Sequence, residues 1–320
     1  MTVHAGLDEA GYGPMLGPLT VGFSAFRREG ELDWRTLAGA VSDAPGEDRD
    51  RLVVADSKRV FTRNPRGARR LEATALTFLD AAGTPAPTSR DLLRCAPEGL
   101  APTDATLGEH PWYEALPGEL PVHCAPEELA AHRDRLAGAL AHADAEVAAA
   151  GVAVIPAGAL NASFDRTDNK GATLWSFHSR VVLDLFERFG EEGLDLTCDR
   201  LGGRARYGRA LSVLVPFSTV RVLSESRQES RYLVTAGERR MRIRFVQKGD
   251  AISLPTALAS CLAKYARELV MGAFNEHFEG VCPGVRPTAG YVTDARRWLE
   301  DMERALPGAL PDRSSLIRNR

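Results

Sequence analysis

Lysine is scarce in this sequence, where only four of the 40 lysine and arginine residues are lysines. No run approaches 18 consecutive apolar residues, so we expect no membrane span. The opening Met1-Thr2-Val3-His4 has neither a basic segment nor a long apolar one, so we expect no secretory signal. The formal net charge of −3 excludes a polycation. Any contact with nucleic acid must therefore use a local basic surface.

Signatures of zinc and disulfide sites are also missing. The five cysteines contain no CxxC pair, which disfavours a zinc ribbon and a disulfide framework and fits buried thiols in a reducing cytoplasm. The seven histidines show no HxH or HExxH spacing, which disfavours a histidine-rich metal site. We therefore expect a cytoplasmic protein that does not contact membranes.

Apolar spacing gives the expected secondary structure. The expected strands are 3–8, 19–26, 52–55, 152–156, 194–198, 219–223, 232–235 and 241–246. The expected helices are 69–79, a segment from Pro126 with apolar spacing as far as Val147, 171–189 and 253–274. Strands that come first and then interleave with helices indicate an α/β or mixed α+β architecture.

The segment 85–126 differs from the rest of the chain. It contains eight of the 19 prolines, a density that argues against regular structure. We expect one domain over residues 1–320, with 85–126 as a surface insertion or linker.

Four acids stand where strands or helices could bring them together. Asp8 and Glu9 end the first expected strand, Asp199 ends another, and Glu268 lies on the last long helix. Each acid alone has a simpler explanation. The first three could be turn caps or surface acids, and Glu268 could form a surface pair with Lys264 worth a few tenths of a kcal/mol.

A convergence of these acids would point to a metal site. Carboxylates about 4 Å apart repel by roughly 1–4 kcal/mol per pair. Such a cluster persists only if a cation compensates it or protons are retained. Oxygen-only ligands favour Mg²⁺ or Mn²⁺. Two such ions about 4 Å apart can stabilise the attacking and leaving oxygens in phosphodiester cleavage.

The segments that carry these acids resemble, in the same order, the motifs of the type 2 ribonuclease H (ribonuclease HII) family. The similar segments are GLDEAGYGPMLGP at 6–18, ADSK at 55–58, Cys198-Asp199 with Tyr207 downstream, KGDA at 248–251, ASCLAKYARE at 259–268, and GYVTD at 290–294 followed by Trp298-Leu299. The resemblance leaves extra length at roughly 60–160 unexplained.

The resemblance implies a ribonuclease H-like fold, with a mixed five-stranded sheet, flanking helices and, here, a large insertion. It implies a metal-dependent endonuclease that hydrolyses RNA in RNA/DNA hybrids or at ribonucleotides embedded in duplex DNA. Asp8, Glu9, Asp199 and Glu268 would be its catalytic and metal carboxylates, with Mg²⁺ or Mn²⁺ as cofactor and two ions during catalysis.

Other positions in these motifs would contact the nucleic acid. The backbone at Gly11, Tyr12 and Gly13 would sense the 2′-OH, and Tyr291 would contact the sugar beside the scissile junction. Lys58, Arg200, Arg204 and Arg206 could hold phosphates, although charged runs are about as often solvated faces.

Two positions depart from the family pattern, and two alternatives stay open. Tyr12 stands where the family usually has arginine or lysine, and Glu268 where it usually has aspartate. Tyr12 and the insertion favour a second hypothesis, a nuclease of this fold acting on branched DNA or structured RNA. The third is a non-cleaving nucleic-acid-binding protein, which the near-neutral charge favours and the retained acids disfavour.

Overall fold

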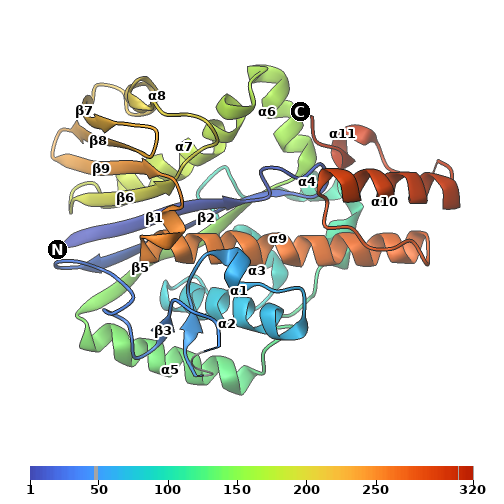
Figure 1. Cartoon of the computed structure of the whole chain (residues 1–320), viewed down its shortest axis with the longest axis horizontal. Helices are drawn as coiled ribbons and strands as arrows, with labels where there is room; N and C mark the ends of the chain where they lie inside the picture. Colours follow the sequence, from blue (N-terminus) through green and yellow to red (C-terminus); the bar gives the residue numbers. More distant parts are fainter. Residues whose placement is uncertain (47–49, 309, 320) are drawn as a thin grey trace.

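A seven-stranded mixed sheet forms the centre of the protein, and helices cover both of its faces (Figure 1). The computed structural model describes residues 1–46, 50–308 and 310–319. The strand order is β5-β2-β1-β6-β9-β8-β7, and β3 and β4 form a separate pair. The strands are β1 (Thr2–Ala10), β2 (Leu19–Arg28), β3 (Val41–Ser42), β4 (Leu52–Val53), β5 (Ala145–Ile155), β6 (Leu194–Asp199), β7 (Thr219–Glu225), β8 (Glu229–Ala236) and β9 (Arg239–Val246).

The helices form two groups on either side of this sheet. In Figure 1, α6, α7 and α8 lie over one face, and α9 runs along the other with α2 and α5 beyond it. The helices are α1 (Ser57–Val60), α2 (Pro65–Ala81), α3 (Ser89–Arg94), α4 (Asp104–Gly108), η1 (Pro111–Ala115), α5 (Pro126–His142), α6 (Ala157–Thr167), α7 (Lys170–Phe189), α8 (Gly208–Leu214), η2 (Gly249–Ala251), α9 (Leu254–Val281), α10 (Val292–Ala305) and α11 (Arg313–Leu316).

The pairing of the strands places three strand ends together. β1 pairs with β6 and β6 with β9, both in parallel, whereas β2 is antiparallel to β1 and to β5. The carboxyl ends of β1, β6 and β9 therefore lie at one edge of the sheet. These five strands make the mixed sheet that the resemblance implies. The described sheet exceeds the expected five strands by two, because β8 and β7 pair antiparallel beyond β9 and extend it.

Helix α9 lies unusually close to β1 and β2, and two glycines allow this approach. A Cβ atom at Gly6 would lie 2.1 Å from the backbone nitrogen of Thr256, and one at Gly22 would lie 2.1 Å from the carbonyl oxygen of Ala259. Contacts this short are sterically forbidden, so only glycine fits at either position. The close approach brings the first turns of α9 against the end of β1.

Most expected elements are present, α6 and α10 are helices that the sequence did not lead us to expect, and two expected regions differ. The helix from Pro126 ends at His142 rather than continuing to Val147, because Asp144 takes a left-handed φ of 47° and β5 begins at Ala145. The Pro-rich segment contains α3, α4 and η1, and buried Trp112 of η1 packs edge-on against Phe274 of α9. It is thus a packed part of the protein. Within the described ranges, no helix is long and apolar enough to cross a membrane.

Candidate functional site

Asp8 is a buried carboxylate at the end of β1. Its Oδ1 accepts a hydrogen bond from the Glu9 backbone N–H at 2.8 Å. Burial, together with the charges of Glu9 and Asp199, raises the pKa of Asp8 well above its usual value, against an opposing hydrogen bond with Ser260 of α9. Asp8 therefore lies near Asp199, which is 191 positions away in the chain, so two of the acids converge as expected from the sequence.

Asp199 ends β6 beside Asp8. The Gly249 backbone N–H donates to its Oδ1 at 2.9 Å and ties it to the segment after β9. Burial raises the pKa of Asp199 to about 6; the Gly249 bond opposes the shift, and the charges of Glu9 and Asp250 add to it. Its position at the end of a buried strand explains both its burial and its acidic neighbours.

Glu9 points to the opposite face of the sheet from Asp8, as neighbouring strand residues do. Its Oε2 lies 3.0 Å from Nε2 of His178, which is buried in α7. The other ring nitrogen of His178 donates to the carbonyl oxygen of Leu174 at 3.0 Å, because a carbonyl can only accept. The contact with His178 therefore fixes Glu9 where its charge acts on Asp8 and Asp199.

Asp250 is an acid of this site that the sequence analysis did not assign. Burial and the charge of Asp56 raise the pKa of Asp250, while Lys58 opposes the shift. Asp8, Asp250 and Asp56 all act on the buried Cys261, whose pKa is raised to about 12 by burial first of all. The sequence does carry a signal for this acid. Asp250 comes four residues after the expected strand 241–246, and Asp8 and Asp199 also stand at strand ends.

Glu268 lies farther along α9 than Ser260, the residue of this helix that hydrogen-bonds Asp8. It is eight residues beyond Ser260, about 12 Å along the helix axis. Its carboxylate accepts a hydrogen bond from Lys264, and both side chains line a cleft of about 690 Å³ that also contains Tyr291. The structure thus brings Asp8, Glu9 and Asp199 together and places Glu268 with Tyr291.

The loop after β1 is held by two buried arginines. Arg318, near the end of the chain, donates from Nη2 to the carbonyl oxygen of Gly11 at 2.6 Å, and Arg267 of α9 donates from Nη1 to that of Pro18 at 2.6 Å. Burial and the neighbouring Arg267 lower the pKa of Arg318 to about 9. The glycine-rich loop is therefore fixed from two distant parts of the chain.

Tyr12 projects from this loop into the site. Burial and the charge of Glu9 raise its pKa, and a Cβ built on Gly202, just beyond Asp199, would lie 3.5 Å from its hydroxyl oxygen. Nζ of Lys170, the first residue of α7, lies 4.7 Å from the centre of the Tyr12 ring. A cation thus stands at the glycine loop, although the loop itself contributes none.

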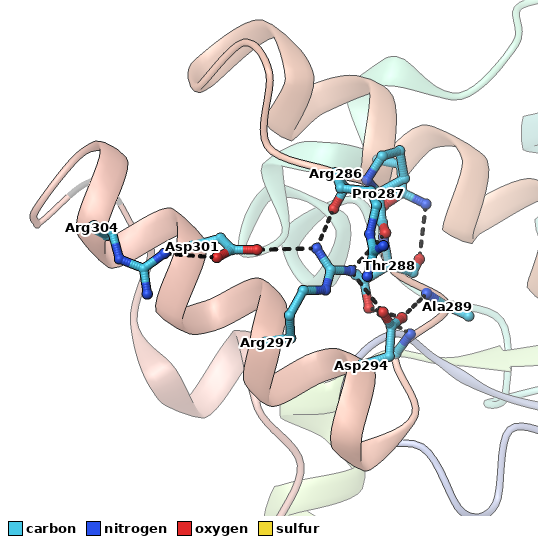
Figure 2. Close-up of polar contacts among 10 residues, drawn as sticks. Arg286, Pro287, Thr288, Ala289, Asp294, Arg297, Asp301 and Arg304 are labelled. Carbon is cyan, nitrogen blue, oxygen red and sulfur yellow. Dashed lines mark hydrogen bonds and ion pairs between the residues drawn. The ribbon is translucent and has the colours of Figure 1, made fainter.

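Tyr291 is half exposed and precedes α10. Figure 2 shows the hydrogen bonds that hold the segment around Asp294. One Asp294 carboxylate oxygen accepts from the Thr288 hydroxyl at 2.7 Å and from the Ala289 backbone N–H at 2.8 Å. The other oxygen accepts from Arg297 at 2.7 Å. Partial burial would raise the pKa of Asp294, but hydrogen bonds from Arg297 and Thr288 outweigh it and lower this pKa to about 2. The segment leading to Tyr291 is therefore anchored by an ionised carboxylate.

The four expected phosphate contacts differ in their surroundings. Lys58 is exposed and close enough to Asp250 to affect its pKa. Arg200 bonds the carbonyl oxygen of Arg204, and Arg204 lies over Trp175, 5.5 Å from the ring centre. Arg206 is 87% exposed and lies 3.6 Å from a carboxylate oxygen of Glu225. Lys58 thus acts on one acid of the site, Asp250, and Arg204 is engaged in packing.

The donor set at this edge fits a hard divalent cation. Its side chains are all carboxylates, and the largest influences on the raised pKa values of Asp8 and Asp199 are burial, neighbouring carboxylates and hydrogen bonds. As placed, no three acid, histidine or cysteine side chains among the described residues are close enough to chelate one ion. The chemistry of the oxygen donors, rather than a preformed chelate, supports a Mg²⁺ or Mn²⁺ site.

Comparison with solved structures gives ribonucleases of one kind. The chain is similar to RNase HII from Archaeoglobus fulgidus, solved in complex with PCNA, at 16% identity over 99% of this chain and 94% of that one, with a TM-score of 0.44. It is similar to ribonuclease H2 from Pyrococcus horikoshii OT3 at 12% identity over 94% and 87%, with a TM-score of 0.40. It is similar to Bst-RNase HIII in complex with Mn²⁺ at 14% identity over 99% of this chain and 66% of that one, with a TM-score of 0.41.

Sequence comparisons add no closer relative. No protein-family model matches the chain, and no curated protein matches it. The identities to the three solved structures lie between 12% and 16%. The solved structures named above are ribonucleases HII and HIII, which are type 2 ribonucleases H, the family that the sequence motifs resemble.

Proposed function

We propose that this protein is a metal-dependent endonuclease that hydrolyses RNA phosphodiester bonds in RNA/DNA hybrids or at ribonucleotides embedded in duplex DNA. One observation carries the proposal. Asp8 and Asp199, far apart in the chain, meet at one sheet edge, where burial and neighbouring carboxylates raise the pKa of both. Such an arrangement is unfavourable in a purely structural protein.

Asp8, Asp199 and Asp250 would hold the metal ions, with Glu9 held beside them by His178. When bound, Mg²⁺ or Mn²⁺ would compensate the carboxylates, activate water and stabilise the leaving oxygen. Asp250 takes the place that the resemblance gave to Glu268 in this proposal. The Lys264–Glu268 pair instead lines the cleft that contains Tyr291.

The remaining contacts would bind and orient the nucleic acid. The carbonyl groups of Gly11 and Pro14 are occupied by Arg318, which holds the loop rigid for close approach to a sugar. Lys170, stacked on Tyr12, would supply a phosphate contact at this loop. Lys58 acts on the pKa of Asp250, and Lys248 directly precedes Gly249, whose backbone N–H bonds Asp199.

The test is hydrolysis of a labelled RNA/DNA hybrid with Mg²⁺ or Mn²⁺. Asp8→Asn should lower the rate by at least about 100-fold, the scale of losing one charge-stabilising group. Asp134→Asn, an exposed carboxylate-to-amide change on α5, is the matched control and should leave the rate unchanged. No hydrolysis by the native protein, or equal rates for native and Asp8→Asn proteins, would refute the proposal.

A second candidate is a nuclease of this fold that acts on another nucleic-acid structure. Tyr12 favours it, because this side chain brings an aromatic ring to the loop expected to sense the 2′-OH. Parallel assays on hybrid, single-ribonucleotide and all-DNA duplexes separate the two. Cleavage that is indifferent to the 2′-OH would favour the second candidate.

A further inference from the structure

An uncovered row of arginines lies on the sheet beside the acidic site. Arg221, Arg231, Arg242 and Arg244, here called the arginine face, come from β7, β8 and β9. Residues directly opposite in the pairing share a face. Arg231 lies opposite Arg244, and both Arg221 and Arg242 lie opposite Leu233. The four guanidinium groups therefore project from the same side of the sheet.

This side is the one that carries the acids. Arg244 lies opposite Thr197 in β6 and donates from Nε to its hydroxyl oxygen at 2.7 Å. Asp199 is two residues beyond Thr197 and so projects from the same face. The arginine face begins about 5 Å from β6 and reaches β7 at about 14 Å, three strand spacings away.

Solvent reaches these side chains. Arg221, Arg231 and Arg242 are exposed, and Arg244 is half-buried. Helix α9 packs on β1, β2 and β5 and lies away from the outer strands (Figure 1). The opposite side of the same strands is buried instead, with Tyr232 and Ile243 in the core. These outer strands thus have one packed face and one face of exposed cations.

Charge on this face is unbalanced toward positive. Besides the acids of the site, two carboxylates of the described strands lie on this side: Glu229, which pairs with Arg231 at 2.7 Å, and Asp195, which lies opposite Arg242. The whole chain carries a net charge of −3, so this concentration is local. A polyanion at the acidic site would be repelled by Asp8 and Asp199, and cations beside them would offset that repulsion.

We propose that the arginine face binds the phosphate backbone of the nucleic-acid duplex to one side of the scissile position. This inference rests on the proposed function and extends it to the path of the substrate. A flat face with guanidinium groups spaced along and across strands suits a row of phosphates better than a single small anion. These contacts fix register without reading sequence.

The test measures binding rather than cleavage. A labelled all-DNA duplex of about 30 bp is titrated without divalent ions, between about 50 and 200 mM salt. Arg221→Gln/Arg242→Gln should weaken affinity roughly tenfold or more near 0.1 M salt and reduce the log–log salt slope by about 2. The control, Arg35→Gln/Arg90→Gln, removes two exposed arginines elsewhere and should retain the native slope.

The outcomes separate this inference from the proposed function. A native slope in Arg221→Gln/Arg242→Gln, an equal loss in the control, or no duplex binding by the native protein overturns the inference. Competition by poly-glutamate with no competition by unlabelled duplex overturns it in favour of an acidic protein partner. A loss of duplex binding in a protein that hydrolyses no hybrid supports the inference and refutes the proposed function.

Discussion

The backbone N–H of Gly249 donates a hydrogen bond to the carboxylate of Asp199 at 2.9 Å. This bond joins the end of β6 to the segment that follows β9 and brings Asp250 into electrostatic contact with Asp199. It therefore sets which acids belong to the site.

Asp250, rather than Glu268, should be essential for hydrolysis. Asp250→Asn should lower kcat on an RNA/DNA hybrid by about 100-fold or more. Glu268→Gln should stay within about tenfold of the native rate, because it breaks only a partly exposed ion pair with Lys264. Steady-state kinetics of the two amide variants checks this, and the opposite ranking would restore Glu268 as the fourth acid.

The metal-free protein should lose stability as pH rises through the titration of Asp199. The folded-state pKa is about 6 against an ordinary 3.8, so the folded state binds more protons between these values. The free energy of unfolding should therefore fall as pH rises from about 4 to beyond 6, with about 3 kcal/mol from this group at neutral pH.

Asp199→Asn is the matched variant for that measurement. It should flatten the decrease and be more stable than the native protein at pH 8 when a chelator is present. Denaturant unfolding at several pH values measures the difference. If the free energy of unfolding of the native protein rose between pH 4 and 7 by as much as that of Asp199→Asn, the raised pKa of Asp199 would be contradicted.

Asp294 should have the opposite pH dependence. Its pKa is lowered to about 2, so its stabilising contribution is present above pH 4 and is lost as pH falls toward 2. Because its side chain is 35% exposed, Asp294→Asn should cost only about 1 kcal/mol at pH 7 and nothing near pH 2. Glu300→Gln, exposed on the same helix, should change stability little at either pH, and an equal cost there would discount the network in Figure 2.

The close approach of α9 to the sheet predicts a strong effect of one added methyl group. Gly22→Ala would place a Cβ 2.1 Å from the carbonyl oxygen of Ala259, so the helix must shift. We expect a loss of about 3 kcal/mol or more. Gly138→Ala on α5 meets no atom within 4 Å and should stabilise by about 0.5–1 kcal/mol. Equal melting temperatures for the two variants would contradict this packing.

Sequence patterns predicted the elements that have strong periodicity. The strands at Asp8 and Asp199 and the helices α7 and α9 were predicted because their apolar spacing reflects burial. The end of α5 was not, since Asp144 adopts its left-handed conformation without the usual glycine. Periodicity also could not reveal that Trp112 packs the Pro-rich segment onto α9.

The candidate site could be predicted only in part. Strand ends identified Asp8 and Asp199, because parallel neighbours bring their carboxyl ends together. The contact between Glu9 and His178 spans 169 residues and has no local pattern. Glu268 was assigned from the helix motif, whereas its separation from Asp8 follows only once Ser260 of α9 is placed beside Asp8.

The most direct test of the account is calorimetric titration of the native protein with Mn²⁺, beside Asp8→Asn and Asp199→Asn. If the acids from separate strands form one cation site, the native protein should bind Mn²⁺ and each single variant should bind it at least about tenfold more weakly. Asp134→Asn should bind like the native protein. Native-like binding by Asp8→Asn or Asp199→Asn, or no binding by the native protein, would contradict the account.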